Sequence, residues 1–211
     1  MDRKIQIDTF SRHSQVSRET ITSLVKYEEL LIEANKSLNL IANSTIINIW
    51  HRHFLDSFQV IDFIDKNQKT LVDIGSGAGF PGLVLSIIAR ERKIPLKIKL
   101  IEKSKRKINF LNEIISKLKL NAHAINQNVE DEKFRFVDDT FVARAFKPLP
   151  KILELIHSKA QNLKKIIIFQ GKNGQLALLQ ASKNWDIKYK QRMSVTSNDS
   201  FIIEINKIEK K

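Results

Sequence analysis

A glycine-rich loop directly after a short apolar run is the feature that most constrains the fold of this chain. Residues 70–82 read Thr-Leu-Val-Asp-Ile-Gly-Ser-Gly-Ala-Gly-Phe-Pro-Gly and hold four of the six glycines in the sequence. Leu71, Val72 and Ile74 predict a buried strand, and the glycines allow a tight turn that lets the backbone approach a ligand. Pro81 suits the first turn of a following helix. The segment therefore predicts the cofactor loop of an α/β enzyme.

Asp73, within this segment, indicates which cofactor the loop serves. A dinucleotide loop directs backbone N–H groups and a helix N-terminus at a pyrophosphate, which a neighbouring carboxylate would repel. S-adenosylmethionine instead carries a sulfonium and an ammonium group, and an acid suits these cations. The frame Gly75-x-Gly77-x-Gly79 begins where the apolar run stops and favours this cofactor.

Two alternatives to this interpretation stay open. The frame Gly77-x-Gly79-x-x-Gly82 formally matches the dinucleotide pattern, which keeps a nicotinamide-dependent oxidoreductase as an alternative. A glycine-rich turn without a ligand is the second, although a plain turn requires fewer glycines.

Glu102 is predicted to be the second cofactor residue. It follows an apolar strand predicted over residues 96–101 and lies about twenty residues beyond the glycines, as a βαβ nucleotide-binding unit expects. A carboxylate there can accept hydrogen bonds from both ribose hydroxyls. The alternative is a solvated acid at a strand end. Ser104 follows as a predicted cap of the next helix.

The rest of the chain alternates strands and helices. Strands are predicted at 122–126, 140–143 and 166–169, a terminal antiparallel hairpin at 187–193 and 201–205, and helices at 152–163 and 176–181. The fold class predicted is α/β: a Rossmann-like, mostly parallel, seven-stranded sheet with a late antiparallel strand. Residues 1–66 are predicted to be a helical extension packed on this sheet, and residues 67–211 to be the catalytic domain.

Composition narrows the functional classes. The chain has no cysteine, which excludes disulfides and thiolate metal sites, and His51 and His53 are spaced poorly for a shared metal, so no metal is expected. No apolar run reaches the length of a membrane span and no signal-peptide core is visible, so a cytoplasmic protein without a membrane partner is expected. The net charge of +13 suggests a nucleic-acid partner, with residues 103–107 as candidate phosphate contacts. A lysine-rich genome composition is the alternative explanation.

Four segments taken together resemble the bacterial ribosomal RNA small-subunit methyltransferase G family, also called glucose-inhibited division protein B. They are Asn35-Lys36-Ser37-Leu38-Asn39-Leu40, Arg52-His53-Phe54-Leu55-Asp56-Ser57, Asp73 to Gly82, and Ala143-Arg144-Ala145-Phe146. A glycine loop alone would indicate only a generic methyltransferase. The block at residues 52–57, ahead of that loop, makes the resemblance specific to this family.

The resemblance implies methyl transfer from S-adenosylmethionine to N7 of a guanine in 16S ribosomal RNA. It implies cofactor contacts at Gly75 and Phe80, at the pair Val129-Glu130 that frames the adenine, and at Arg144. No catalytic residue is nominated, because guanine N7 has a lone pair and no proton to remove. The expected enzyme is a monomer that acts on 16S rRNA or a small-subunit particle. Two rival functions stay open: a methyltransferase that acts on a small molecule or a protein, and a non-enzymatic RNA-binding module.

Some residues keep competing interpretations at this point. Arg144 follows a central strand, where it either contacts the cofactor or RNA, or pairs with a structural acid such as Asp56. His53 and Asp56 lie on one face of a helix, and a structural contact is favoured over a catalytic pair. One departure from the family pattern concerns Gln170-Gly171, which stands where the family commonly has Lys-Gly.

Overall fold

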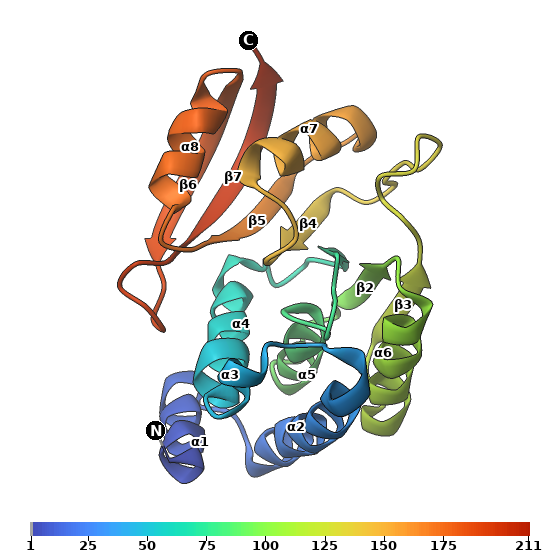
Figure 1. Cartoon of the computed structure of the whole chain (residues 1–211), viewed down its shortest axis with the longest axis vertical. Coiled ribbons are helices and arrows are strands. Elements are labelled where there is room, and N and C mark those ends of the chain that lie inside the picture. The colour runs from blue at the N-terminus through green and yellow to red at the C-terminus, as the bar shows by residue number, and fades with distance from the viewer. Residues whose placement is uncertain (1) are drawn as a thin grey trace.

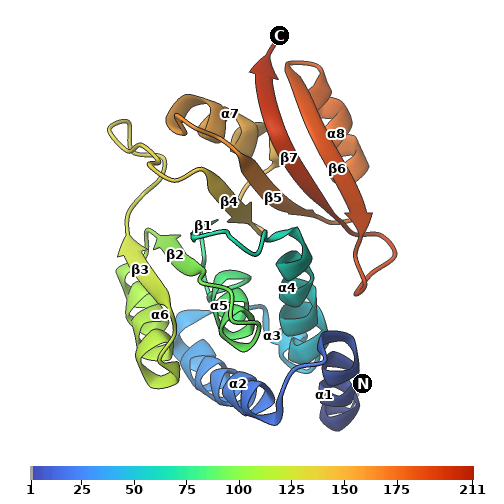
Figure 2. The same ribbon diagram turned by 180° about the vertical axis from the view of Figure 1, so that it is seen from behind.

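The computed structural model describes residues 2–211, and its centre is one seven-stranded sheet. Its strands lie in the order β3-β2-β1-β4-β5-β7-β6, which Figure 2 shows from one edge to the other. Their bounds are β1 Thr70–Ile74, β2 Lys97–Glu102, β3 Ala122–Asn126, β4 Thr140–Ala143, β5 Lys165–Gln170, β6 Trp185–Met193 and β7 Phe201–Lys210.

Strands β1 to β5 are parallel, and β7 is antiparallel to both β5 and β6. The strand order reverses at β1, which has β2 on one side and β4 on the other. The loops after β1, β2 and β4 therefore meet at the carboxyl edge of the sheet, where open α/β sheets bind their ligands. The predicted fold class, including the late antiparallel strand, is confirmed.

Helices cover both faces of the sheet (Figure 1). One face packs against α5 (Gly82–Glu91), α6 (Lys105–Leu118) and the N-terminal helices, and the other packs against α7 (Leu149–Lys159) and α8 (Gly174–Ser182). Successive strand residues alternate between the faces, so Leu71 belongs to the first core and Val72 to the second. The three layers bury both faces of the central strands, which explains their continuous apolar sequences.

The N-terminal part is helical, as predicted. Its elements are α1 (Arg3–Ser14), α2 (Arg18–Leu38), α3 (Asn43–Ile46), the π-helical turn η1 (Trp50–Leu55), α4 (Asp56–Phe58) and the 3-10 turn η2 (Gln59–Phe63). Ser17 caps α2 by accepting a hydrogen bond from Thr20 N at 3.3 Å. Leu24, Tyr27 and Leu31, all in α2, are buried. These helices share one apolar core with α5 and α6, and the division at residue 66 stays a prediction.

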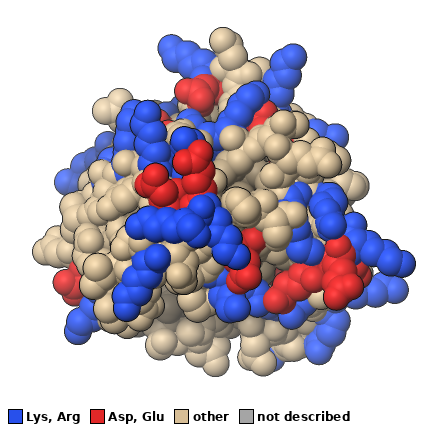
Figure 3. All heavy atoms as spheres, turned by 90° about the horizontal axis from the view of Figure 1, so that it is seen from above, with Lys and Arg blue, Asp and Glu red and all other residues tan. Residues whose placement is uncertain are grey.

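Charge is distributed over the surface without a single dominant patch on the face seen in Figure 3. There, Lys and Arg side chains lie both across the middle of the face and around its rim, and groups of Asp and Glu lie among them. Within residues 2–211, no helix is both long enough and apolar enough to cross a bilayer. The excess of positive charge is thus spread over many elements, and charge alone does not locate a partner.

Candidate cofactor site

The glycine loop after β1 needs glycine for two different reasons. Gly75, Gly77 and Gly79 have positive φ angles of 71°, 56° and 97°, a region that strains other residues. At Gly82 the constraint is space, because a Cβ would lie 2.3 Å from a Leu100 side-chain carbon and 2.7 Å from Asp73 Oδ2. The loop conformation therefore depends on this spacing of glycines.

Strand β2 occupies several of the backbone N–H groups of this loop. Gly75 N and Ser76 N both donate to Ile101 O, at 2.9 and 3.1 Å, and Gly77 N donates to Glu102 Oε2 at 3.2 Å. In a dinucleotide loop such N–H groups face a pyrophosphate. Here the protein itself supplies their acceptors, and a bound anion would have to displace a carboxylate.

Asp73 lies fully buried beneath the loop. Its Oδ2 accepts a hydrogen bond of 2.9 Å from Gly82 N at the start of α5, the place where a helix N-terminus would otherwise attract an anion. Burial raises the pKa of this carboxyl to about 7, and the Gly82 N–H opposes the rise. Within residues 2–211, Oδ1 has no hydrogen-bond partner. The carboxylate lies outside the cavity wall described next, and its predicted contact with the cofactor stays a prediction.

A cavity of about 240 Å³ opens on the other side of the loop, at the carboxyl ends of β1 and β2. We call it the cofactor cavity. Its wall includes four of the residues predicted from the sequence: Gly75, Glu102, Val129 and Glu130. The other predicted residues, Asp73, Gly77, Gly79, Phe80 and Arg144, are outside this wall.

Glu102 joins the loop to the cavity. Its Oε2 accepts from Gly77 N, and its Oε1 accepts from Ser104 N at 2.8 Å. Each carboxylate oxygen has two acceptor positions, so the group can still bind hydroxyl groups of a ligand. The expectation for Ser104 is corrected in one respect: it holds the N-cap position of α6, but its side chain makes no capping hydrogen bond.

The far wall of the cavity combines an apolar contact with an ion pair. Val129 is only 4% exposed and provides an apolar surface. Glu130 Oε1 lies 2.8 Å from Lys147 Nζ, and this lysine lowers the pKa of the exposed Glu130 carboxyl. The Glu130 side chain is thus already in an ion pair, and its backbone takes no part in that pair.

Sequence reasoning missed several wall residues, above all Phe146 and Lys147. The Phe146 ring lies against the glycine loop, since a Cβ on Gly75 would be 2.3 Å from Phe146 Cδ2. Ala145 precedes it with a positive φ of 50°, which turns the chain after β4. The sequence does contain a signal for Phe146 and Lys147. They follow Arg144 directly, in the loop after a central strand, where open α/β sheets bind ligands. Gln127 and Asn128 carry no comparable signal.

Arg144 is bound to the N-terminal segment by all three of its guanidinium nitrogens. Nε donates to Asp56 Oδ2 at 3.0 Å, Nη2 donates to Arg52 O at 2.7 Å, and Nη1 donates to His53 Nδ1 at 3.1 Å. The structural pairing with Asp56 is therefore the arrangement observed. Asp56 Oδ1 also accepts from Thr196 Oγ1, at 3.0 Å, so this network joins η1 and α4 to β4 and to the β6–β7 turn.

His53 is held as a neutral ring. Because a guanidinium only donates, Nδ1 must accept from Arg144, and Nε2 then carries the proton toward Thr45 Oγ1 at 2.9 Å. Burial and the neighbouring Arg144 charge lower the pKa of His53 to about 3. With this lowered pKa the ring stays neutral near pH 7 and does not change its protonation state, which agrees with a structural role for His53 and Asp56.

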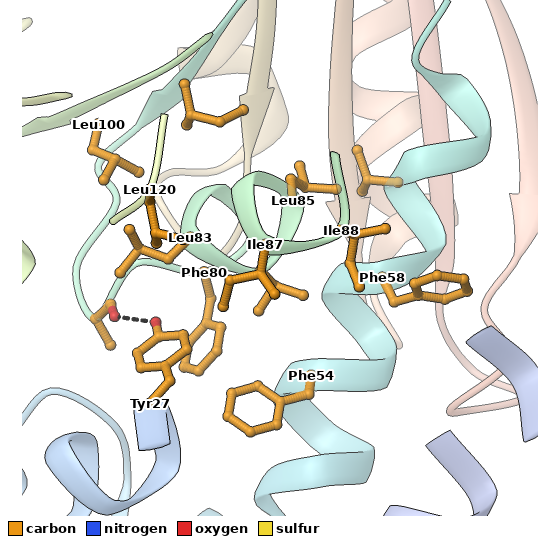
Figure 4. Close-up of a cluster of buried hydrophobic side chains, with 14 of the residues drawn as sticks. Tyr27, Phe54, Phe58, Phe80, Leu83, Leu85, Ile87, Ile88, Leu100 and Leu120 are labelled. Carbon is orange, nitrogen blue, oxygen red and sulfur yellow. Dashed lines mark hydrogen bonds between the residues drawn. The ribbon is translucent and has the colours of Figure 1, made fainter. Parts of the chain in front are cut away.

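Aromatic residues of the N-terminal helices hold the end of the glycine loop (Figure 4). Tyr27 Oη donates to Ala78 O at 2.6 Å, and the Tyr27 ring stacks on Phe80 with centroids 5.5 Å apart. His53 stacks on Phe80 at 4.9 Å, and Phe54 packs beside it. Phe80 therefore acts as an anchor of the loop in a buried aromatic cluster.

Among residues 2–211, the side chains around this cavity do not form a metal site. No group of three His, Asp or Glu side chains in this range lies close enough to hold a metal ion. His53, which stacks on the loop residue Phe80, is committed to Arg144 and Thr45. The carboxylates in the cavity wall, Glu102 and Glu130, are bound to Gly77, Ser104 and Lys147, so the site offers binding surfaces and hydrogen-bond partners.

Comparison with known proteins identifies the family. Residues 20–203 match the GidB family, rRNA small subunit methyltransferase G. The Ribosomal RNA small subunit methyltransferase G of Pelagibacter ubique (strain HTCC1062) is 40% identical over 203 residues, which cover 95% of this chain and 94% of that protein. The protein of the same name from Rickettsia akari (strain Hartford) is 37% identical over 196 residues, covering 93% of this chain and 98% of that protein.

A solved structure agrees in fold. The crystal structure of an S-adenosylmethionine-dependent methyltransferase from Aquifex aeolicus superposes with a TM-score of 0.55 at 14% identity, covering 83% of this chain and 97% of that one. At this identity the likeness shows the fold alone. The family match sets aside the oxidoreductase and the non-enzymatic RNA-binding module. The chain belongs to the rRNA small subunit methyltransferase G family and is an S-adenosylmethionine-dependent methyltransferase of ribosomal RNA.

Proposed function

We propose that this enzyme transfers the methyl group of S-adenosylmethionine to N7 of a guanine in 16S ribosomal RNA, as the family resemblance implies. One observation carries the assignment of the cofactor cavity: the protein's own carboxylates occupy the anion positions of the glycine loop. The Asp73 carboxylate accepts a hydrogen bond from Gly82 N at the start of α5, and the Glu102 carboxylate accepts one from Gly77 N. A cavity built this way suits a cationic nucleoside better than a pyrophosphate.

The residues of the cavity wall fit the parts of such a nucleoside. Glu102 has acceptor positions for the two ribose hydroxyls, and Val129 offers an apolar contact to the adenine ring. We assign the contact with the adenine amino group to the backbone carbonyl of Glu130, since its side chain is paired with Lys147. Gly75 also lines this wall, where the Phe146 ring fills the space that a Gly75 Cβ would take.

The other predicted residues contribute by positioning. Gly77 and Gly79 give the loop its turns, and Phe80 anchors it in the aromatic cluster. Asp73 fixes the start of α5, and Arg144 fixes the N-terminal segment against β4. Asp73 also places a carboxyl beneath the loop, where the positive charge of the bound cofactor would favour its ionised form.

The chemistry asks little of the protein beyond alignment. When bound, S-adenosylmethionine supplies an electrophilic methyl group, and guanine N7 has the lone pair that attacks it. No proton leaves N7, so a general base is unnecessary. Holding the reacting atoms about 3 Å apart in a line is the task of the site, and such positioning supplies several kcal/mol.

The proposal also covers the RNA substrate, the oligomeric state, the location and the domain organisation of the protein. Guanine N7 faces the major groove, which is deep and narrow in A-form RNA, so the target lies in an irregular or single-stranded region. Lys103 and Lys107 lie in the cofactor-cavity wall, whereas Arg106 Nη2 donates to Ser37 O at 3.0 Å, so residues 103–107 do not act as one patch. We further propose a monomer that works in the cytoplasm and consists of residues 1–66 packed on the domain 67–211.

Calorimetry and RNA methylation test this function. The wild-type protein should bind S-adenosylmethionine, and Glu102→Ala should bind it at least about tenfold more weakly, since two hydrogen bonds to a charged group are lost. Glu113→Ala on the exposed face of α6 is the matched control and should bind normally. Purified small subunits from cells lacking this enzyme should gain 7-methylguanine in 16S rRNA. Methylation at another atom, or unchanged cofactor binding by Glu102→Ala, would contradict the proposal.

A further inference from the structure

Lysines without ion-pair partners gather at the amino edge of the sheet, the edge opposite the cofactor cavity. Three loops meet there: residues 64–69 ahead of β1, residues 92–96 between α5 and β2, and residues 119–121 between α6 and β3. Backbone hydrogen bonds join them, from Lys97 N to Lys69 O at 2.8 Å and from Ile98 N to Asn121 O at 3.0 Å. We define the amino-edge cluster as four exposed lysines in these loops and at the start of β2: Lys69, Lys93, Lys97 and Lys119.

Further contacts bring the ends of α5 and α6 together. Arg90 Nη1 donates to Leu118 O at 2.8 Å, and Lys93 N donates to Arg90 O at 3.2 Å. Lys93 and Lys119, which follow these two helices, have φ angles of 54° and 51°, in the left-handed region that favours glycine or asparagine. Neither turn needs a lysine for its conformation, and both leave a cation at this edge.

The protein does not neutralise these four cations. None of them forms an ion pair with a carboxylate among residues 2–211. Acids at the same edge have partners of their own. Glu91 Oε2 accepts from Ser17 Oγ at 2.7 Å and from Thr20 Oγ1 at 2.6 Å, and Asp138 pairs with Lys99 at 2.8 Å. The charge of the cluster is therefore left to solvent ions or to a partner.

Helix dipoles account for only half of the cluster. The carboxyl ends of α5 and α6 carry partial negative charge, which Lys93 and Lys119 complement by about 0.3–1 kcal/mol each. Lys69 and Lys97 lie at the starts of strands instead, where no helix ends. The backbone holds these two like charges on neighbouring strands, and their repulsion is largest at low salt. A polyanion bound across the edge would remove this repulsion.

Helix α6 connects the amino edge to the cofactor cavity. It runs beside β3 at one side of the molecule (Figure 1, Figure 2). Lys103 and Lys107 near its start line the cavity, Lys119 follows its end, and its 14 residues span about 21 Å. The exposed positions between Lys107 and Lys119 are neutral except for Glu113 and Lys117, which pair with each other at 2.6 Å. A nucleic acid at the cavity can thus continue along α6 without meeting an unpaired acid.

We infer that the amino-edge cluster binds the phosphate backbone of a second segment of 16S rRNA, remote from the guanine that is methylated. The inference rests on the proposed function and adds to it a contact surface away from the reaction. Lysine suits this contact, because its ammonium group neutralises phosphates as a point charge and does not read sequence. The cluster therefore supplies affinity and orientation on a large RNA, and the choice of guanine is made elsewhere.

A charge-neutralised variant tests this surface against a matched control. The cluster variant combines Lys69→Gln, Lys93→Gln, Lys97→Gln and Lys119→Gln. The control removes four exposed lysines that also lack ion pairs, with Lys183→Gln, Lys188→Gln, Lys190→Gln and Lys210→Gln, so both lower the net charge of +13 by four. Labelled protein is titrated with small subunits from cells lacking the enzyme, at several salt concentrations.

The cluster variant should bind small subunits at least about tenfold more weakly than the wild type. The slope of log affinity against log salt should become less steep by about 3, because each lost phosphate contact contributes about 0.7–0.9. The control should keep the wild-type slope to within about one such contact. In methylation assays the cluster variant should show a raised KM for subunits and an unchanged kcat. Its affinity for S-adenosylmethionine, measured by calorimetry without RNA, should equal that of the wild type.

Two further measurements separate charge from folding and RNA from protein. Arginine at the same four positions keeps the charge and should restore wild-type binding. The loss in the glutamine variant should also appear with protein-free 16S rRNA. A wild-type salt slope in the cluster variant, an equal loss in the control, no rescue by arginine, or a loss confined to intact subunits, which would assign the cluster to a ribosomal protein, would overturn the inference. A wild-type enzyme that methylates no guanine would instead contradict the proposed function, so the two failures are distinguishable.

Discussion

The two sides of the glycine loop differ sharply in character. The inner side faces the N-terminal helices and is closed: Asp73 and Tyr27 are fully buried, and Phe80 is stacked between Tyr27 and His53. The outer side faces the cofactor cavity and is open, with Glu102 as its principal acceptor. The same short motif thus contributes residues to a packed core and to a ligand surface.

This difference separates residues that shape the loop from residues that can touch a ligand. Substitutions on the inner side should mainly lower the stability of the fold, and they should weaken cofactor binding only as a consequence of that loss. Changes on the outer side should alter binding with little effect on folding. Substitutions on the two sides test this separation, and the largest effect is expected within the loop itself.

Gly79→Val should have the largest effect on folding. The residue has a φ of 97°, and a Cβ would lie 2.4 Å from Leu83 Cδ1 and 2.8 Å from Tyr27 Oη. Backbone strain and overpacking together should lower the free energy of unfolding by about 4 kcal/mol. Urea denaturation measures this. Gly171→Val, with no atom near its Cβ, is the control and should change stability by less than about 0.5 kcal/mol; equal losses in both variants would contradict the separation of roles.

Asp73→Asn should change the pH dependence of stability. The pKa of Asp73 is about 7 in the fold and 3.8 in an unperturbed chain, so between these values the folded state keeps a proton that the unfolded state has lost. Wild-type stability therefore falls as pH rises through this window, and the variant has no such proton. Relative to Asp73→Asn, the wild type should lose roughly 2–3 kcal/mol between pH 5 and pH 8 without cofactor. Parallel stability curves for the two proteins would show that Asp73 does not titrate in this way.

Tyr27→Phe tests whether a change on the inner side of the loop alters cofactor binding on the outer side. The variant loses only the hydrogen bond to Ala78 O, which should cost about 1 kcal/mol of stability. Because this bond positions the loop, KM for S-adenosylmethionine should rise a few-fold while kcat stays near the wild-type value. Tyr189→Phe, at a residue 42% exposed, should change neither quantity. An unchanged KM in Tyr27→Phe would show that the aromatic cluster stabilises the fold without shaping the site.

Glu130→Gln should have the smallest effect. Its side chain forms an exposed pair with Lys147, and such pairs contribute little to stability. The backbone of Glu130, which we assign to the adenine, is unchanged by this substitution. The melting temperature and the cofactor affinity should both equal those of the wild type. A clear loss of affinity would assign the adenine contact to the carboxylate instead.

Much of the fold was predictable because local patterns and tertiary needs agree in this chain. Leu71, Val72 and Ile74 form β1 as the apolar run predicted, and the loop has the positive φ angles that its glycines indicated. Glu102 ends β2 and faces the cavity, as its spacing from the glycines suggested. Each of these features depends on residues close in sequence.

The partners of Asp73 and Tyr27 were not predictable in the same way, and Asp56 was only one of the alternatives for Arg144. Tyr27 contacts Ala78, which is 51 residues away, and Arg144 contacts Asp56, which is 88 residues away. No periodicity or motif records such pairings. The charge of Asp73 correctly argued against a bound anion, but its burial beneath the loop depends on how α5 packs on β1.

The sequence by itself determined the strands, the glycine turns and the family, since these follow from apolar patterns and short motifs. Only the tertiary structure decided which motif residues face a ligand and which face the core. It also decided that Phe146 and Lys147, after β4, reach the cavity beside the glycine loop. The physical reason is that burial and long-range hydrogen bonds arise when distant segments pack, and a local pattern contains no information about which segments will meet.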